Sequence, residues 1–579
     1  MLEWIELEEI LKEVESLIGQ ENYGEVLNKI NSIESLNRLD ENTHLNVLYI
    51  KSICYYNLGE LNKARETSTK LLNKSREHQN VLYGLDAIRI LLKISIMFEI
   101  RTESKRLIEE GDILLNQSVD VEWKGYKHRK AALLYLKAMT FDPNIDSTKQ
   151  LPLIQESLSL RKEINEKSGI SESLFGLGNY YSFKGDLDLA MKYYEQSLAV
   201  GKETGSKHLI SQAYRAIGNN YLSRGKINRA LDYTKKALTL SESIDNKCDI
   251  SHNLLHLGEI YYFKGELESA EKFIIKALEI AESIEYTVIL ILGLYVLGRL
   301  LQDQGEFQAS LECYEKALNI VKEKDAKFYM AEGLYHLIRL YTYHLSPSKA
   351  IPLLTDLEEL KKQDQNVWHN LIYRICKALI LKTSKRLPDK MEALNIFQEI
   401  AEEHYVVHKV TVEAIINLCD LLLYELKTTG NEDILDELNR NCDRLLEIAQ
   451  EQNSFSLLAQ TYWLQSKLAL LNLDIKQAQM LLINAQDITE KKGLKTLGDS
   501  INYEHYSFFS QLQKWEEYID KNVSLSQRIE LAQLENLVIR MIYQQMSGVP
   551  TKTIDELMRI EEFQAYLKEA KRILSEYKQ

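Results

Sequence analysis

The stretch LGNYYSFKGDLDLAMKYYEQSL, beginning at Leu177, is followed by three similar stretches at intervals of 40 residues without a gap. They are IGNNYLSRGKINRALDYTKKAL from Ile217, LGEIYYFKGELESAEKFIIKAL from Leu257 and LGRLLQDQGEFQASLECYEKAL from Leu297. Repetition at a fixed period of this size predicts an array of supersecondary units, each packed mainly against its two neighbours. Such an array grows by adding units, so the 579 residues need not divide into several globular domains.

Small side chains recur at three places in each stretch. Two antiparallel helices approach closely only where the facing side chains are small, so these positions predict helix–helix contacts. We expect Gly178 to face Ala190 across one hairpin, with Tyr181 and Tyr194 beside that contact. The recurring small residues are Gly178, Gly218, Gly258 and Gly298, then Ala190, Ala230, Ala270 and Ser310, and finally Ser197, Ala237, Ala277 and Ala317.

A second glycine in each stretch predicts the turn between two helices, because glycine readily takes the left-handed conformation that ends a helix. These turn glycines are Gly185, Gly225, Gly265 and Gly305. Acidic residues follow three of them, at Asp186, Glu266 and Glu306, and suit the positive start of a second helix. Each unit is therefore expected to be a helical hairpin, and the hairpins must stack because one alone cannot bury its apolar face.

These positions resemble the tetratricopeptide repeat family, whose usual period is about 34 residues. The period of 40 residues implies helices that are longer by roughly 1.5 turns in each unit. It is similar to the repeats of kinesin light chains, Pins/LGN scaffolds and bacterial peptide-sensing regulators. The proline that usually ends the family's second helix is replaced here, which agrees with second helices that run on. The replacing residues are Lys202, Glu242, Glu282 and Lys322.

Weaker units extend the array in both directions. We expect an all-α, right-handed superhelical solenoid of stacked antiparallel hairpins, about eleven or twelve in number. Divergent hairpins are expected over residues 1–130, the regular block over 131–325, and further divergent hairpins over 326–492. The repeat is lost over residues 493–579, where capping helices are expected, including a final helix near Ile554–Tyr577.

Composition excludes several classes of function. The formal net charge of −14 makes nucleic acid a poor partner, because phosphate binding needs clustered Lys and Arg. The most apolar stretch, Val288–Leu301, is too short to span a membrane and contains Arg299. Six scattered cysteines without a C-x-x-C pair are typical of reduced thiols, and the acidic N-terminal segment is unlike a signal peptide. We therefore expect a soluble cytoplasmic protein that binds neither nucleic acid nor membrane.

No catalytic or cofactor signature is found, since nucleophile elbows, phosphate-binding glycine loops, dinucleotide fingerprints and zinc motifs do not occur in the sequence. The chain is therefore expected not to be an enzyme and to need no cofactor. The best metal candidate is His252 with His256, four residues apart on one helix face, and Glu259 one turn further. Packing of the two histidines within the array is the favoured alternative, so we predict no metal site.

The resemblance also implies where a partner would bind. In the family, the first helix of each hairpin lines the concave surface, and its second, fifth, ninth and twelfth positions face the groove. Asparagine amides there can bond to a peptide backbone, and arginines can pair with ligand carboxylates. The alternative is that Asn179 and Asn219 only bond to neighbouring helices. With Gly178 taken as the eighth position, the implied groove residues are Phe175, Asn179, Ser182, Gln212, Arg215, Asn219, His252, Glu259, Tyr262, Tyr295, Arg299 and Arg339.

Two functions follow from this groove. The first is a scaffold or adaptor that binds a peptide or helix of a partner protein along the concave surface. The alternative is a sensor that changes its superhelix conformation when a peptide or partner binds. A sensor usually carries an output module, and the scaffold is favoured because none is recognisable, although the loosely matching region before Lys130 is where one would lie.

Overall fold

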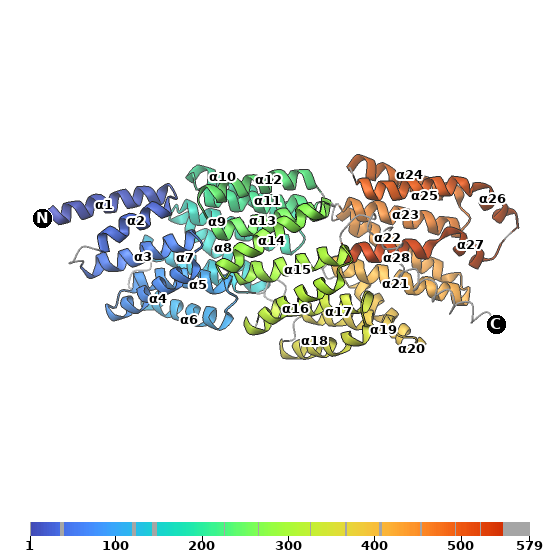
Figure 1. The fold of residues 1–579 in the computed structure, drawn as a ribbon, viewed down its shortest axis with the longest axis horizontal. Helices are drawn as coiled ribbons and strands as arrows, with labels where there is room; N and C mark the ends of the chain where they lie inside the picture. The colour runs from blue at the N-terminus through green and yellow to red at the C-terminus, as the bar shows by residue number, and fades with distance from the viewer. Residues whose placement is uncertain are drawn as a thin grey trace.

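The computed structural model describes residues 2–547 except 35–39, 118–122, 142–146, 225, 265, 325, 365–366, 404–407, 452–453, 493 and 522. Within these residues the chain forms 28 α-helices, one short 3-10 helix and no strand. Figure 1 shows the helices stacked in an elongated array, with α1 at one end and α26 at the other. The predicted all-α solenoid is confirmed.

Consecutive helices pair into twelve hairpins in the described part of the chain, followed by four C-terminal helices. The first helices are α1 (Leu2–Gly19), α3 (Glu41–Asn57), α5 (Val81–Met97), α7 (Lys124–Met139), α9 (Lys167–Phe183), α11 (Lys207–Ser223), α13 (Lys247–Lys264), α15 (Thr287–Asp303), α17 (Lys327–Tyr343), α19 (Val367–Lys382), α21 (His408–Thr429) and α23 (Phe455–Leu471). The second helices are α2 (Tyr23–Glu34), α4 (Leu61–Glu77), α6 (Arg101–Gln117), α8 (Ser147–Glu163), α10 (Leu187–Thr204), α12 (Ile227–Ser243), α14 (Leu267–Ser283), α16 (Phe307–Lys324), α18 (Ala350–Asp364, after the 3-10 helix Pro347–Lys349), α20 (Leu387–Glu402), α22 (Asp433–Glu451) and α24 (Ile475–Lys492).

The recurring glycines lie where the two helices of a hairpin touch. A Cβ atom added to Gly218 would lie 2.6 Å from Thr234 Oγ1 and 3.2 Å from the carbonyl oxygen of Ala230. At Gly178 the nearest atoms belong to the ring of Tyr194 rather than to Ala190. Gly178 therefore makes room for the ring of Tyr194, four residues after Ala190. This contact of a glycine with a large side chain differs from the contact between two small residues that the sequence predicted.

The turn glycines behave as predicted wherever the structure describes them. Gly185 and Gly305 have φ values of 79° and 82°, in the left-handed region. Asp186 caps α10, because its carboxylate accepts a hydrogen bond from the backbone N–H of Leu189 at 2.9 Å. The other two turn glycines, at positions 225 and 265, lie outside the described residues.

Successive first helices also contact one another, as α9, α11, α13 and α15 do in turn. The family resemblance implies that the first helices lie on the inner side of the superhelix, and the contacts between them agree with this placement. We call the inward-facing surface of the first helices the inner wall.

The C-terminal helices do not simply cover the end of the array. They are α25 (Lys495–Ser510), α26 (Leu512–Lys521), α27 (Leu525–Ala532) and α28 (Leu534–Ser547). The first of them packs against α24 and continues the stack, whereas α28 runs back to lie against α21 and α23 and also contacts α15 (Figure 1). The final helix expected near Ile554–Tyr577 lies outside the described residues.

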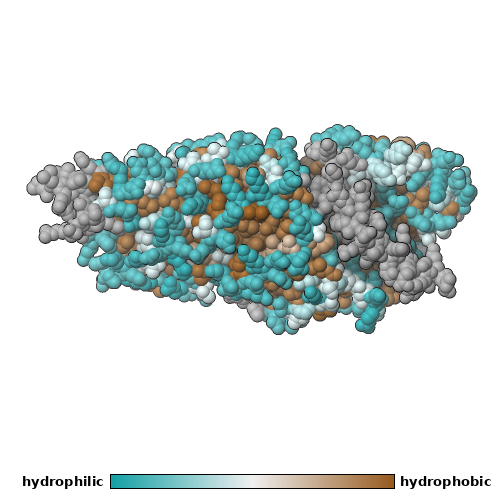
Figure 2. All heavy atoms as spheres, in the orientation of Figure 1, coloured by the Kyte–Doolittle hydropathy of each residue, from teal (hydrophilic) through white to brown (hydrophobic). Residues whose placement is uncertain are grey.

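The most apolar stretch of the sequence forms α15. On the face shown in Figure 2, hydrophilic residues cover most of the surface and hydrophobic residues gather near the middle, around this helix. Among the helices described, none is both long and apolar enough to cross a bilayer. The six cysteines are all free thiols.

Candidate partner-binding surface on the inner wall

The structure sorts the twelve predicted groove residues by exposure. Three are buried, namely Tyr262, Tyr295 and Arg339. One, Asn219, is exposed. The other eight are half-buried on α9, α11, α13 and α15: Phe175, Asn179, Ser182, Gln212, Arg215, His252, Glu259 and Arg299.

Five side chains form a continuous polar row across α11, α13 and α15. Arg215 Nη1 donates to His252 Nε2 at 3.2 Å, and the His252 ring stacks on that of His256 with centroids 5.3 Å apart. His256 Nδ1 lies 3.6 Å from Glu259 Oε2, and Glu259 Oε1 lies 3.8 Å from Arg299 Nη2. The row therefore begins and ends with an arginine, and of these two arginines only Arg299 has a carboxylate of the row beside it.

The two histidines of the row are neutral at physiological pH. Burial lowers the pKa of His252 well below its usual value, and the neighbouring Arg215 lowers it further. The same two causes lower the pKa of His256 to about 3. A neutral His252 can accept the hydrogen bond from Arg215. No group of three or more potential metal ligands is found among the described residues.

The two asparagines of the predicted groove differ. Asn179 Oδ1 accepts a hydrogen bond from the hydroxyl of Tyr194 at 2.8 Å, so it bonds to the second helix of its own hairpin, as the alternative interpretation held. Phe175 lies beside the same tyrosine, with ring centroids 6.0 Å apart. Asn219 instead exposes its side chain to solvent. Of the two, Asn219 is the more exposed.

The buried tyrosines of the predicted groove support the fold. The guanidinium carbon of Arg299 lies over the ring of Tyr262, 5.6 Å from the ring centroid. The hydroxyl of Tyr295 donates to the backbone carbonyl of Tyr329 at 2.7 Å. These tyrosines are thus not open to solvent, unlike the groove positions that the resemblance implied for them.

Arg339 is buried for a different reason, because it forms an ion pair inside the array. Its Nε lies 3.0 Å from Glu413 Oε1, and both side chains are 4% exposed. The hydroxyl of Tyr335 also donates to Glu413. Glu413 comes from α21, two hairpins further along the chain, so the sequence register of α17 alone offered no sign of this partner.

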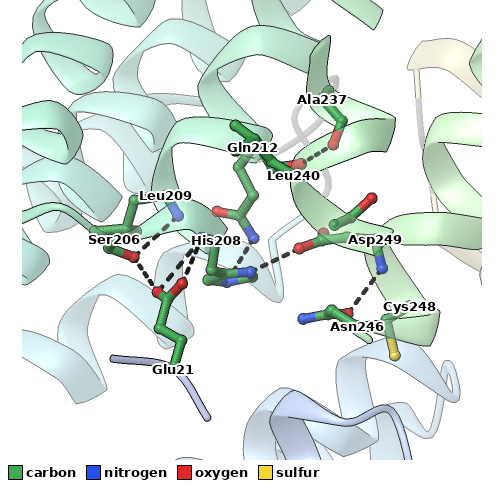
Figure 3. Close-up of polar contacts among 12 residues, drawn as sticks. Glu21, Ser206, His208, Leu209, Gln212, Ala237, Leu240, Asn246, Cys248 and Asp249 are labelled. Atoms are coloured by element: carbon green, nitrogen blue, oxygen red, sulfur yellow. Dashed lines mark hydrogen bonds and ion pairs between the residues drawn. The ribbon is translucent and has the colours of Figure 1, made fainter. Parts of the chain in front are cut away.

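The turn of the N-terminal hairpin contacts the start of α11 (Figure 3). The carboxylate of Glu21, in the turn between α1 and α2, accepts hydrogen bonds from the hydroxyl of Ser206 at 2.5 Å and from the backbone N–H of His208 at 3.2 Å. The ring Nδ1 of His208 lies 2.6 Å from Asp249 Oδ2, and its Nε2 lies 3.1 Å from Gln212 Nε2. Glu21 thus joins the first hairpin to the sixth.

The surroundings of His208 favour its protonated form. Burial lowers the pKa of His208, but the carboxylates of Asp249 and Glu21 outweigh burial and raise the pKa above its usual value. A protonated His208 can donate to Asp249, which adds a charge-assisted hydrogen bond between α11 and α13. Sequence reasoning did not find Glu21, His208 or Asp249, since no local pattern marks a contact between hairpins so far apart.

A second contact continues the same junction. Asn62 Nδ2, in α4, donates to Glu285 Oε1 at 3.0 Å, before the start of α15. A Cβ atom added to Gly59 would lie 2.9 Å from Lys247 Cβ, at the start of α13. Hairpins five apart in the sequence therefore touch, and the superhelix closes on itself. We call these contacts, together with those of Glu21, the seam.

Comparison with known proteins supports the family. A family model described as tetratricopeptide repeat matches residues 169–243 and 249–323, which form α9–α12 and α13–α16. These residues thus match the tetratricopeptide repeat, as the resemblance predicted for the regular block. No curated protein sequence matches the chain.

Several solved structures have similar helix arrangements at low sequence identity. A Rap protein complexed with competence and sporulation factor has 12% identity and a TM-score of 0.42, covering 71% of this chain and 99% of that one. The apo form of the quorum sensor NprR from B. thuringiensis has 16% identity and a TM-score of 0.43, with coverage of 65% and 99%. Aspartyl phosphate phosphatase F from Bacillus subtilis has 12% identity and a TM-score of 0.41, with coverage of 63% and 92%. Similarity this low transfers no residue roles to this chain.

Proposed function

We propose that the chain is a non-enzymatic interaction protein that binds an acidic or extended peptide segment of a partner along the inner wall. Arg215 carries this proposal. Among the described residues it forms no ion pair with a carboxylate, and its Nε is buried without a hydrogen-bond partner. A buried hydrogen-bond donor without an acceptor destabilises a protein unless a ligand supplies the acceptor. A carboxylate suits a guanidinium best, because it can accept two parallel hydrogen bonds.

The neighbours of Arg215 favour an anionic ligand at this point of the wall. His252 and His256 are neutral and Glu259 is engaged by Arg299, so the Arg215 charge has no neutralising carboxylate within its own row. Asn219, one helical turn along α11, can bond to both a donor and an acceptor of an extended backbone. Together they offer one charged and one amide contact on the same helix.

A second function is favoured by the seam. A ligand that binds between the first and the sixth hairpin would separate Glu21 from Ser206 and His208, so its binding would be coupled to opening of the superhelix. The chain would then act as a sensor of its ligand. A rise in the radius of gyration on partner binding, measured by small-angle X-ray scattering, supports the sensor, whereas an unchanged radius supports the scaffold.

The test of the wall is Arg215→Gln, which removes the charge and keeps a polar side chain that can donate a hydrogen bond. Lys192→Gln is the matched control, because it makes the same charge change on the exposed surface of α10. We expect the first variant to lose the partners that wild type captures from native cell extract, while the control keeps them. Capture of the same partners by a folded Arg215→Gln protein contradicts the proposal.

A further inference from the structure

Helix α28 has the features of a helix bound in a groove. Its buried apolar residues are Leu534, Leu537, Val538, Met541 and Ile542. They recur at intervals of three and four and so form one stripe along the helix. Asn536, on the opposite face, is exposed. The stripe faces α21 and α23 on the inner wall, and this arrangement is how amphipathic helices bind hydrophobic grooves.

The inner wall changes character where α28 covers it. In α21, every side chain from Val410 to Cys419 is buried, and α23 is buried on all sides over Ser466–Leu471. In α9 and α11, by contrast, polar residues such as Asn179 and Asn219 remain half-buried or exposed on the inner side. A helix that is buried on all sides needs a second cover, and α28 supplies it for α21 and α23.

The two last helices are attached by different kinds of contact. In α27, Arg528 Nη1 donates to the carbonyl oxygen of Leu471 at 2.5 Å, and Nη2 lies 3.3 Å from Glu432. Among the described side chains of α28, the polar anchor is the ion pair of Glu535 Oε1 with Lys427 Nζ at 3.0 Å, whose side chains are 43% and 38% exposed. A solvent-exposed pair of this kind contributes little. Helix α28 is therefore held mainly by its apolar stripe.

The joint between the two helices is a single residue. Gln533 has a φ of 50°, in the left-handed region, and separates α27 from α28. A change in the backbone of this one residue would release α28 while Arg528 keeps α27 in place. Apolar packing is non-directional, so another helix with the same stripe can fill the same space.

We propose that the apolar inner wall of α21 and α23 is a helix-binding surface that α28 occupies in the free protein. The partner is an amphipathic helix with the apolar spacing of α28 and an acidic residue in its first turn, placed to face Lys427 as Glu535 does. This helix exchanges with α28. The inference rests on the proposed function in placing partner binding on the inner wall, and it names the class of partner for the C-terminal half.

The test uses a fluorescent peptide with the sequence of α28, LENLVIRMIYQQMS, added to the full-length protein. The substitutions Leu537→Asp and Val538→Asp in the protein disfavour the resident helix and leave the wall unchanged. We expect the double variant to bind the peptide at least tenfold more tightly than wild type does. A peptide carrying the same two substitutions is the control and is expected not to bind. Equal affinity of the two proteins, or no binding by a folded variant, overturns the proposal.

Hydrogen exchange of the wild-type protein is a second test of the proposal, and it can be made even where the double variant does not fold. With excess peptide, the amides of α28 are expected to exchange faster while those of α21 stay protected. Unchanged hydrogen exchange in α28 contradicts the replacement of α28 by the peptide. Arg215→Gln is expected to bind the peptide as wild type does, so failure of the peptide test and failure of the Arg215 test are separate results.

Discussion

The buried ion pair between Arg339 and Glu413 provides the sharpest stability prediction. Its atoms Nε and Oε1 lie 3.0 Å apart, and each side chain is 4% exposed. Arg339→Met removes one partner and leaves a carboxylate in the interior, where the hydroxyl of Tyr335 still donates to it. Breaking a buried pair in this way costs about 3–5 kcal/mol, because the uncompensated charge stays out of water.

The double variant Arg339→Met with Glu413→Gln is the matched control. The amide introduced at position 413 carries no charge and still accepts from Tyr335, so most of the lost stability is expected to return. An array of hairpins need not unfold in one step, so the measurement is hydrogen exchange in α17 and α21 together with urea unfolding. A single variant within about 1 kcal/mol of wild type, or a double variant as unstable as the single one, would refute the reasoning.

Two further predictions concern the regular block. Gly218→Leu is expected to lower the free energy of unfolding, measured in urea, by about 1–3 kcal/mol, because a Cβ there would lie 2.6 Å from Thr234 Oγ1. Asn219→Leu, at the exposed neighbouring position, is the control and is expected to leave the free energy of unfolding unchanged. Equal free energies of unfolding for the two variants would mean that the helix contact is elsewhere. The pKa of His256 is lowered to about 3 in the folded protein, against 6.5 in the unfolded chain. Between these two pH values the unfolded chain binds one more proton at this residue than the folded protein does. The stability that depends on neutral His256 is therefore present above pH 6.5 and falls by up to ~1.4 kcal/mol per pH unit below it. His256→Gln is expected to flatten this fall between pH 6.5 and about 4, as measured by urea unfolding across that range, and an unaltered slope would contradict a buried neutral imidazole.

The amino-acid sequence predicts the site in outline but not its exposure. Register placed Arg215, His252 and Arg299 on the inner side, and the structure brings them into one polar row. Register could not show that Tyr262 would lie under Arg299 or that Arg339 would be buried. The burial of these side chains depends on which residues the neighbouring hairpins place beside them, and the sequence of a single repeat does not specify those residues.

The helical hairpin and its period were determined by the amino-acid sequence alone. The reason is that the residues in contact belong to one unit, as Gly218, Ala230 and Thr234 do. The pattern of small and large side chains within a repeat therefore encodes the helix contact directly.

Only the tertiary structure decided the contacts between distant hairpins. The seam joins Glu21 to His208, which are 187 residues apart. The position of α28 brings Glu535 to Lys427 across 108 residues. Such contacts arise from the small rotation of each hairpin on the last, summed over many units, and no local pattern specifies that sum.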